Sequence, residues 1–168
     1  MSVSVIENPY AYKLIYVFRS PEEKLRGLLK IGDATVPCTL SREAAIKAYP
    51  PNCQALNDAA NARIKGYMGT SGMAWQLLYT ELAFYNEIEQ GEEGAFRDFD
   101  VHGILRRSGH PKVILEGSNA REWFRIPLPV AVSAIQAAKA RRAVLSAKES
   151  NPTFIPVTLW PNQREAVD

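Results

Sequence analysis

The sequence has little cysteine and no long apolar run. Two cysteines, Cys38 and Cys53, occur among its 168 residues, and no Cys-x-x-Cys pair is present. Two cysteines without such a pair indicate neither a disulfide scaffold nor a zinc site, and we interpret both cysteines as free thiols in a reducing compartment. No run of apolar residues is long enough to cross a bilayer, and the N-terminus has no charged segment followed by an apolar one. We therefore expect a soluble, cytoplasmic protein with no membrane partner.

An excess of charge of one sign is also absent, and so is a nucleotide-binding loop. The 20 lysines and arginines nearly balance the 18 aspartates and glutamates, and the net charge of +2 indicates little about partners. No Gly-x-x-x-x-Gly-Lys-Ser/Thr pattern occurs, so the chain cannot be an NTPase on its own.

Basic residues do gather in one stretch of the chain. The candidates for contact with a phosphate backbone are Arg106, Arg107, Lys112 and Arg121. A basic segment of this kind is typical of nucleic-acid binding. An ordinary solvated surface explains the same charges equally well.

The hydrophobic pattern predicts one compact core built from strands and helices, since 46% of the residues are hydrophobic. Strands are expected at 12–18, 28–32 and 75–82, the first two joined as a hairpin with a long loop. Helices are expected at 41–49, 52–67, 96–108 and 127–147. Asn52 is expected to cap the second of these helices, with Gly69 and Gly72 closing it.

Two short triplets carry the first chemical signal. Leu14-Ile15-Tyr16 lies in the first expected strand and Lys30-Ile31-Gly32 in the second. A tyrosine in a strand is most often a core aromatic residue whose hydroxyl is hydrogen-bonded, so the triplets alone do not indicate a site.

Two of the expected helices place charged groups beside apolar ones. Arg63 shares a helical face with Leu56, Ala60 and Tyr67, so we expect it to point inward or into a cleft, where it needs a partner. A snorkelling arginine at the helix end is an equally good interpretation.

The second charged position is Asp98, which precedes His102 by four residues on one helix face. A carboxylate and a histidine arranged in this way can hold a hard divalent cation that keeps most of its waters. The alternative to a cation site is a structural role, in which the aspartate stabilises the first turn of the helix through the helix dipole.

Taken in this order, the triplets, Arg63 and the Asp98 to His102 pair resemble the signature of the GIY-YIG nucleases, in particular their phage-type branch. The resemblance spans roughly residues 12–140. It implies an α/β (α+β) domain in which a small three-stranded antiparallel sheet is flanked by helices. It also implies a DNA endonuclease that depends on Mg²⁺ or Mn²⁺.

The resemblance further assigns roles to five residues. Tyr16 would help to deprotonate the attacking water, Arg63 would contact the scissile phosphate, His102 would support the site, and Lys30 could add a phosphate contact. Asp98 stands where the family has its metal-binding glutamate and is one methylene shorter, while Lys30 replaces the tyrosine of the second triplet, as in some members of the branch.

Residues 119–125 resemble the closing Arg-Glu-aromatic-Phe segment of the same branch. We expect Trp123 and Phe124 to anchor the last helix to the sheet, and Glu122 is a weaker candidate for the site.

The last residues change character. The stretch 153–166 reads as an apolar strand followed by Trp-Pro-x-Gln-Arg, and it resembles the lead-in to a superfamily 2 helicase motor. We therefore expect a nuclease-like domain at 1–147, and at 148–168 a linker and the start of a helicase motor in a longer polypeptide, with restriction or defence as its setting. A plain C-terminal tail is an equally good interpretation.

Two other functions stay open. A degenerate, non-catalytic DNA-binding module that positions an attached helicase is favoured by the change from glutamate to Asp98. Residues 36–55 lengthen the link between the second expected strand and the first core helix. A protein-interaction domain that uses this insert would show no salt-sensitive affinity for DNA.

Overall fold

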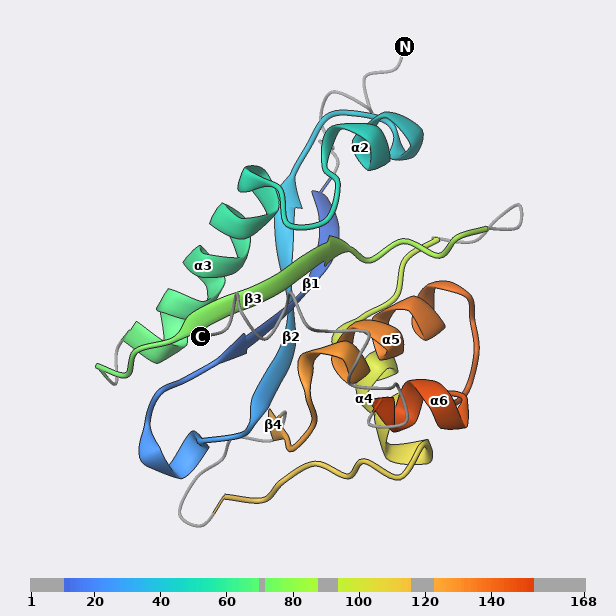
Figure 1. Cartoon of the computed structure of the whole chain (residues 1–168). Helices are drawn as coiled ribbons and strands as arrows, with labels where there is room; N and C mark the ends of the chain where they lie inside the picture. The colour runs from blue at the N-terminus through green and yellow to red at the C-terminus, as the bar shows by residue number, and fades with distance from the viewer. Residues whose placement is uncertain (1–10, 70–71, 88–93, 116–122, 153–168) are drawn as a thin grey trace, which may run out of the picture.

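A four-stranded antiparallel sheet forms the centre of the computed structural model, which describes residues 11–69, 72–87, 94–115 and 123–152 (Figure 1). Its strands are β1 (Ala11–Arg19), β2 (Leu29–Pro37), β3 (Gln76–Leu82) and β4 (Trp123–Phe124). The order across the sheet is β3-β1-β2-β4. The expected α+β class is confirmed, whereas the expectation of three strands is wrong because Trp123 and Phe124 pair with Lys30 and Leu29.

The central strand β1 is buried on both faces because its apolar residues alternate. Leu14, Tyr16 and Phe18 belong to one core cluster, and Ile15 and Val17 belong to the other. This confirms the strand expected at 12–18 and explains why one strand can serve two layers.

Strand β2 extends further than the sequence analysis predicted. It continues beyond residue 32 through Asp33, Ala34, Thr35 and Val36 to Pro37 and pairs with β1 along this whole length. The reason is a period-two pattern in which Ala34 and Val36 are buried while Thr35 is exposed. The loop before β2 contains a short 3-10 helix, η1 (Glu23–Leu25).

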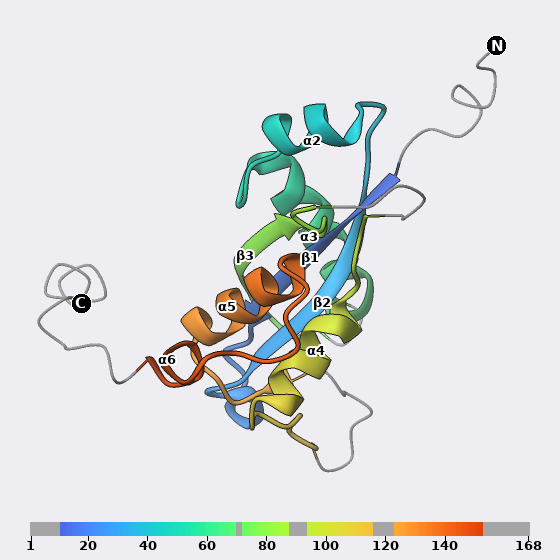
Figure 2. The same cartoon turned by 90° about the vertical axis from the view of Figure 1, so that its right-hand side faces the viewer.

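Helices cover both faces of the sheet (Figure 2). On one side lies α3 (Gln54–Met68), with α2 (Arg42–Ala48) near its N-terminal end, and on the other lie α4 (Asp98–Arg107), α5 (Leu128–Lys139) and α6 (Ala147–Ser150). The segment 36–55 takes part in packing, since Cys38 and Ala45 are buried in the cluster under α3.

Two helix boundaries differ from the prediction. The helix expected at 127–147 ends at Lys139, because Arg141 adopts a positive φ of 59° and Ser146 caps the separate helix α6 by accepting from Glu149 N. Asn52 does not cap α3: Cys53 is the N-cap residue, and the Asn52 side chain instead accepts a hydrogen bond from Thr80 N at 3.0 Å. Gly69 is the C-cap of α3, as expected.

Across the described ranges, no helix is both long and apolar enough to cross a membrane. The strand and helicase-like segment expected at 153–166 lie outside the described residues. Helix α6 spans the expected domain boundary at residue 147 and is tied to the rest of the domain by a 2.6 Å hydrogen bond between His110 Nε2 and Ser150 Oγ. The division at residue 147 stays a prediction.

Candidate active site at the edge of strand β2

The two triplets meet through Tyr16 and Gly32, which are directly opposed on β1 and β2. The Tyr16 side chain is 2% exposed and lies over Gly32, where a Cβ atom would stand 2.5 Å from the tyrosine hydroxyl oxygen and 2.6 Å from its Cζ. Only glycine leaves room for this approach. The glycine of the second triplet therefore leaves the space that the tyrosine ring of the first triplet occupies.

Lys30 lies on the same sheet face, two residue pairs along the β1 to β2 ladder from Gly32, where β4 joins the sheet. It is opposed by Phe18 on β1 and by Trp123 on β4, whose rings contact edge to face with centroids 5.5 Å apart. Lys30 is 8% exposed, so it belongs to the packed face of the sheet at the end where β4 joins it.

His102 is held against the edge of β2 at the point where the pairing with β4 stops. Its Nε2 atom lies 2.8 Å from the carbonyl oxygen of Ile31, and its ring centroid lies 5.3 Å from that of Phe124. Because a carbonyl oxygen only accepts, the Nε2 atom carries the hydrogen in this arrangement. His102 and Asp98 lie one turn apart on α4, as the spacing predicted.

Asp33 joins β2 to the beginning of α4, and sequence reasoning missed it. Its carboxylate accepts hydrogen bonds from Arg97 Nε at 2.7 Å and from the backbone nitrogen of Asp98 at 3.1 Å. Burial alone would raise the pKa of Asp33, but the hydrogen bonds from Arg97 and Asp98 hold that pKa below its ordinary value. The only signal in the sequence is a carboxylate directly after the second triplet.

An open groove runs along this edge of β2 between α3 and the start of α4. Its volume is about 720 Å³, and we call it the edge groove. Four charged side chains line it: Lys13 of β1, Asp33 of β2, Arg63 of α3 and Arg97 at the N-cap of α4. Helix α3 lines the groove with Ala59, Ala62 and Gly66 as well, and these small residues leave the space open. Among these lining residues three cations face one carboxylate, and Arg97 is ion-paired with it.

Arg63 lines the edge groove and is exposed, so of the two orientations expected from the sequence it takes the cleft-facing one. The buried stripe of α3 consists of Leu56, Ala60, Ile64 and Met68. The helical spacing of apolar residues placed Arg63 beside this stripe. Because the Arg63 side chain is exposed, it does not carry the cost of a buried charge.

The candidate metal position is Asp98, the first residue of α4, which is half-buried and adjacent to Asp33. Over the ranges that the structure describes, no three His, Cys, Asp or Glu side chains gather into a group that could hold a metal ion. Carboxylate oxygens in such small number suit Mg²⁺ or Mn²⁺, which bind with most of their waters retained, and do not suit Zn²⁺.

The basic candidates lie away from the edge groove. Arg106 and Arg107 are exposed in the last turn of α4, and Arg106 lies roughly 12 Å along the helix axis from Asp98 at 1.5 Å per residue. Lys112 is exposed beyond the end of the helix. Arg107 also donates from Nε to the carbonyl oxygen of Ala143 at 2.8 Å. Arg121 and Glu122 lie outside the described residues.

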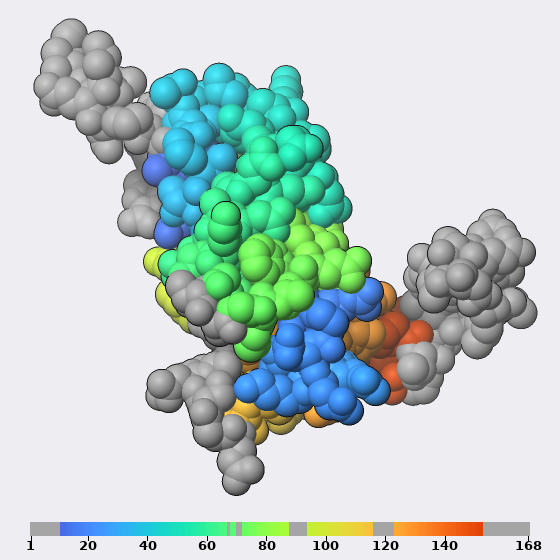
Figure 3. Space-filling model, turned by 90° about the vertical axis from the view of Figure 1, so that its left-hand side faces the viewer, coloured from blue at the N-terminus to red at the C-terminus, as the bar shows by residue number. Residues whose placement is uncertain are grey.

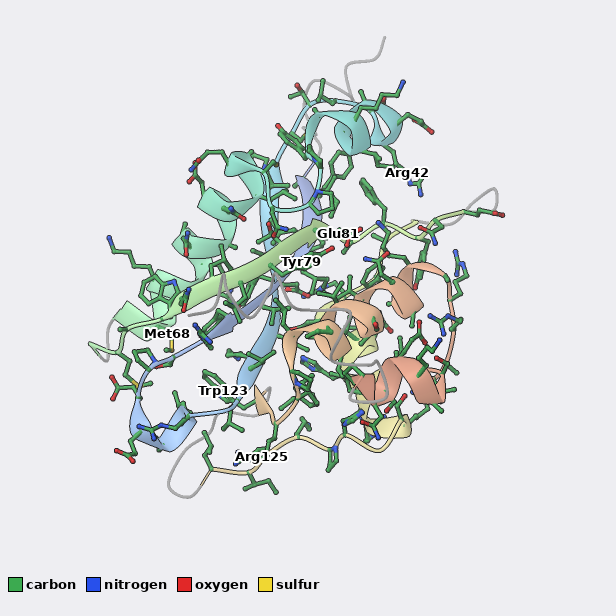
Figure 4. All side chains as sticks on the ribbon, viewed as in Figure 1. Arg42, Met68, Tyr79, Glu81, Trp123 and Arg125 are labelled. Carbon is green, nitrogen blue, oxygen red and sulfur yellow. The ribbon has the colours of Figure 1, made fainter. Side chains whose placement is uncertain are left out.

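A second buried group of ionisable side chains joins β3 to α5 at the opposite edge of the sheet (Figure 4). Glu81, which is 6% exposed, forms an ion pair with Lys139 and accepts hydrogen bonds from Tyr79 Oη at 2.5 Å and Gln136 Nε2 at 2.7 Å. Burial, followed by the hydrogen bond to Glu81, raises the pKa of Tyr79. Each of these contacts of the Glu81 carboxylate is made by a donor, so we assign this group a structural role in holding α5 against β3.

Comparison of the chain with family models, with curated proteins and with solved structures gave no match.

Proposed function

We propose that the edge of β2 is the active site of a metal-dependent DNA endonuclease with a GIY-YIG-like fold. The observation that carries the proposal is the contact between Tyr16 and Gly32, which seats the tyrosine of the first triplet on the glycine of the second. Elements flanking the same strand supply an arginine from α3 and a carboxylate from α4. These are the groups that phosphodiester hydrolysis needs.

The charges of the edge groove support DNA as the substrate. Lys13, Arg63 and Arg97 attract a phosphate backbone, and the guanidinium of Arg63 can neutralise the charge that develops on the scissile phosphate. The groove is open and lies at the sheet edge, so a strand of DNA reaches it without unfolding any element.

The buried phenol of Tyr16 is the group that we assign to the attacking water. Its hydroxyl lies beside Gly32, which has no side chain to cover it. His102 is a positioning residue in this scheme, because its bond to Ile31 oxygen fixes α4 against β2. Lys30 contributes positive charge beneath the sheet edge.

Asp98 is the ligand that we assign to a Mg²⁺ or Mn²⁺ ion, because it lies at the first position of α4, where the resemblance places the metal-binding carboxylate. Such an ion, when bound, supplies Lewis-acid stabilisation of phosphate charge and lowers the pKa of a water. Asp98 carries one methylene fewer than glutamate, so we expect Asp98→Glu to increase cleavage.

Supercoiled plasmid incubated with the purified chain and Mg²⁺ tests this function. We expect nicked or linear product, with Asp98→Asn and Tyr16→Phe each slowing cleavage on the order of 100-fold or more. Asp58→Asn is the matched control, since Asp58 is an exposed carboxylate on the outer face of α3 that is bonded to Gln54. Cleavage that persists in Asp98→Asn contradicts the metal assignment.

A non-catalytic DNA-binding module is the second candidate, and one observation favours it. The carboxylate nearest to Asp98 is engaged by Arg97, which reduces the negative charge available to a cation. DNA binding that weakens with salt, together with no cleavage in Mg²⁺ or Mn²⁺, would select this candidate. Attachment to a helicase motor in a defence system is part of the proposal for either candidate.

A further inference from the structure

A second groove lies at the opposite end of the sheet from α2, and the proposed nuclease does not use it. It has a volume of about 750 Å³ and is bounded by the turn between β1 and β2, the beginning of β3 and the approach to α5. The turn and the beginning of β3 lie side by side on the surface in Figure 3. We call it the arginine groove after Arg19, Arg26 and Arg125, which line it.

Hydrogen bonds hold the walls of the arginine groove in place. The buried hydroxyl of Ser20 donates to the carbonyl oxygen of Ala74 at 2.8 Å and accepts from Glu22 N at 3.2 Å, which ties the turn to the segment before β3. Arg19 donates from Nε to Gln76 Oε1 at 2.8 Å across the β1 and β3 pair. These walls are therefore formed before a partner arrives, which lowers the entropic cost of binding.

Positive charge at the rim is not balanced by acids in the lining. Arg125 reaches the turn that carries Arg26, because its Nη1 lies 3.3 Å from where a Cβ atom on Gly27 would stand. No aspartate or glutamate is among the lining residues in the part of the chain that the structure describes. Arg26 lies 4.0 Å from Glu23, but both side chains are largely exposed, so this pair is weak. The rim is therefore complementary to anionic groups.

The floor of the arginine groove is aliphatic. Leu29 and Ile126 are buried there, while Leu78 and Leu128 are half-buried. The first two belong to the core cluster beneath α4 and α5, and the other two pack against it. The groove is thus an opening onto this cluster, and a partner that covers the two half-buried leucines gains free energy by removing apolar surface from water.

This lining favours a peptide over a nucleic acid. Trp75 also borders the groove, but its ring packs against the cluster beneath α3, and its Nε1 donates to Asn61 Oδ1 of that helix at 3.0 Å. A phosphate backbone would pair with the arginines and place polar sugars against the leucines, and a small inorganic anion would leave the leucines uncovered. A segment with carboxylates beside aliphatic side chains matches both the rim and the floor.

We propose that the arginine groove binds a short acidic segment of a partner protein, in which glutamate or aspartate stands beside leucine or isoleucine. The carboxylates pair with Arg26 and Arg125, and the aliphatic side chains cover Leu78 and Leu128. Arginine binds a carboxylate through two parallel hydrogen bonds, which adds geometric specificity to the charge. This site does not depend on the proposed nuclease reaction and needs no metal ion.

Fluorescence anisotropy with labelled peptides of equal length tests the proposal. The probe is a peptide of glutamate and leucine, and two comparison peptides replace either its leucines with serine or its glutamates with glutamine. We expect saturable binding of the probe that weakens as salt is raised, and binding of each comparison peptide that is at least about fivefold weaker. Because these changes are made in the peptide, the fold of the protein is unaffected.

Variants of the protein test whether the peptide binds in this groove. Arg125→Gln and Arg26→Gln should each weaken binding of the probe at least about threefold and reduce its dependence on salt, because each removes an ion-pair partner. Both arginines are exposed, so these substitutions should leave the fold intact. Lys47→Gln, which removes an equal charge from the exposed end of α2, is the matched control and should leave the affinity unchanged.

Four results would overturn the proposal. The first is no saturable binding of the probe, and the second is equal binding of the leucine and serine peptides, which would show an anion site without apolar recognition. The third is an equal loss of affinity in Arg125→Gln and Lys47→Gln. The fourth is an oligonucleotide that binds more tightly than the probe and loses this affinity in Arg125→Gln, which would assign the groove to nucleic acid.

Sedimentation of the chain alone supplies a further check. We expect the sedimentation coefficient of Arg125→Gln to equal that of the wild type. A wild-type dimer that dissociates in Arg125→Gln would make a second copy of the chain the occupant and would contradict the proposal. Plasmid cleavage is measured separately, so loss of either activity leaves the other test valid.

Discussion

Gly32 and Tyr16 are coupled through direct contact, because the tyrosine ring occupies the space that any side chain at position 32 would need. The position of the tyrosine hydroxyl is therefore set by a residue with no side chain. A periodicity argument finds the strand and the alternation of its faces. It does not find a contact of this kind, since the contact depends on the register between two strands.

Replacing Gly32 with alanine should destabilise the protein and displace Tyr16. The new Cβ atom would lie 2.5 Å from the Tyr16 hydroxyl oxygen, so we expect the free energy of unfolding to fall by about 1–3 kcal/mol. Urea denaturation measures this change, and plasmid cleavage should fall with it.

Gly66→Ala is the matched control for that substitution. Gly66 is exposed within α3, and no atom lies within 4 Å of a Cβ placed there. Alanine at this position should raise the free energy of unfolding by about 0.5–1 kcal/mol, because glycine is unfavourable inside a helix. Destabilisation of both variants alike would show that the Tyr16 contact does not set the cost.

Other residues of the candidate site differ in how far the sequence indicates where they lie. Arg63 and the Asp98 to His102 pair follow from helical spacing, which is local. Asp33 does not, because its main partner, Arg97, is 64 positions away in the chain. A long-range ion pair leaves no periodic pattern in the sequence.

At the scale of elements, the Asp33 carboxylate attaches α4 to β2. It accepts from the first backbone N–H of α4 and so adds a negative charge at the positive end of the helix dipole. The side chain of Arg97, the N-cap residue of α4, completes the attachment.

This attachment predicts a pH dependence of stability. The pKa of Asp33 is lower in the folded state, so its contribution is complete above its ordinary pKa of 3.8 and is lost as the pH falls through the lower, folded-state value. At pH 7 we expect Asp33→Asn to lower the free energy of unfolding by about 1–2 kcal/mol. Urea denaturation between pH 7 and pH 2 should show this difference shrinking at the acid end.

Asp58→Asn serves as the control for the pH series, since its exposed carboxylate contacts only its own helix neighbour among the described hydrogen bonds. We expect a change within about 0.5 kcal/mol. A difference between wild type and Asp33→Asn that stays constant down to pH 2 would contradict the role assigned to the ionised carboxylate.

The elements that the sequence mispredicted are those whose limits are set by tertiary contacts. Strand β4 has two residues, too few for a periodic signal, and exists because Trp123 and Phe124 meet β2. Helix α5 ends just before Arg141, which adopts a positive φ, and the next residue, Arg142, forms an ion pair with Glu149. Apolar periodicity alone continues past this point.

At the scale of the whole molecule, one sheet separates two hydrophobic clusters. Ile64 lies in the cluster beneath α3, and Leu105 lies in the cluster beneath α4 and α5; both are fully buried. Strand β1 contributes alternate residues to each cluster, which links the stability of one layer to that of the other.

Truncating either core should therefore weaken a single cooperative unit. We expect Ile64→Ala and Leu105→Ala each to lower the free energy of unfolding by about 2–5 kcal/mol, with one transition seen by both circular dichroism and tryptophan fluorescence. Because the two sites lie on opposite faces of the sheet, the effects should add within about 0.5 kcal/mol. Two separate transitions would mean that the α3 layer folds independently.

The edge of β2 also bears on self-association. Beyond Lys30, no strand in the described ranges pairs with this side of β2, and an open edge of that kind is a template onto which a strand of another molecule can add. Three features oppose such templating: His102 occupies the Ile31 carbonyl, Asp33 places a charge on the edge, and Pro37 has no N–H to donate. His102, which positions α4 in the proposed site, therefore also covers part of this open edge, and we expect its substitution to increase self-association separately from any loss of activity.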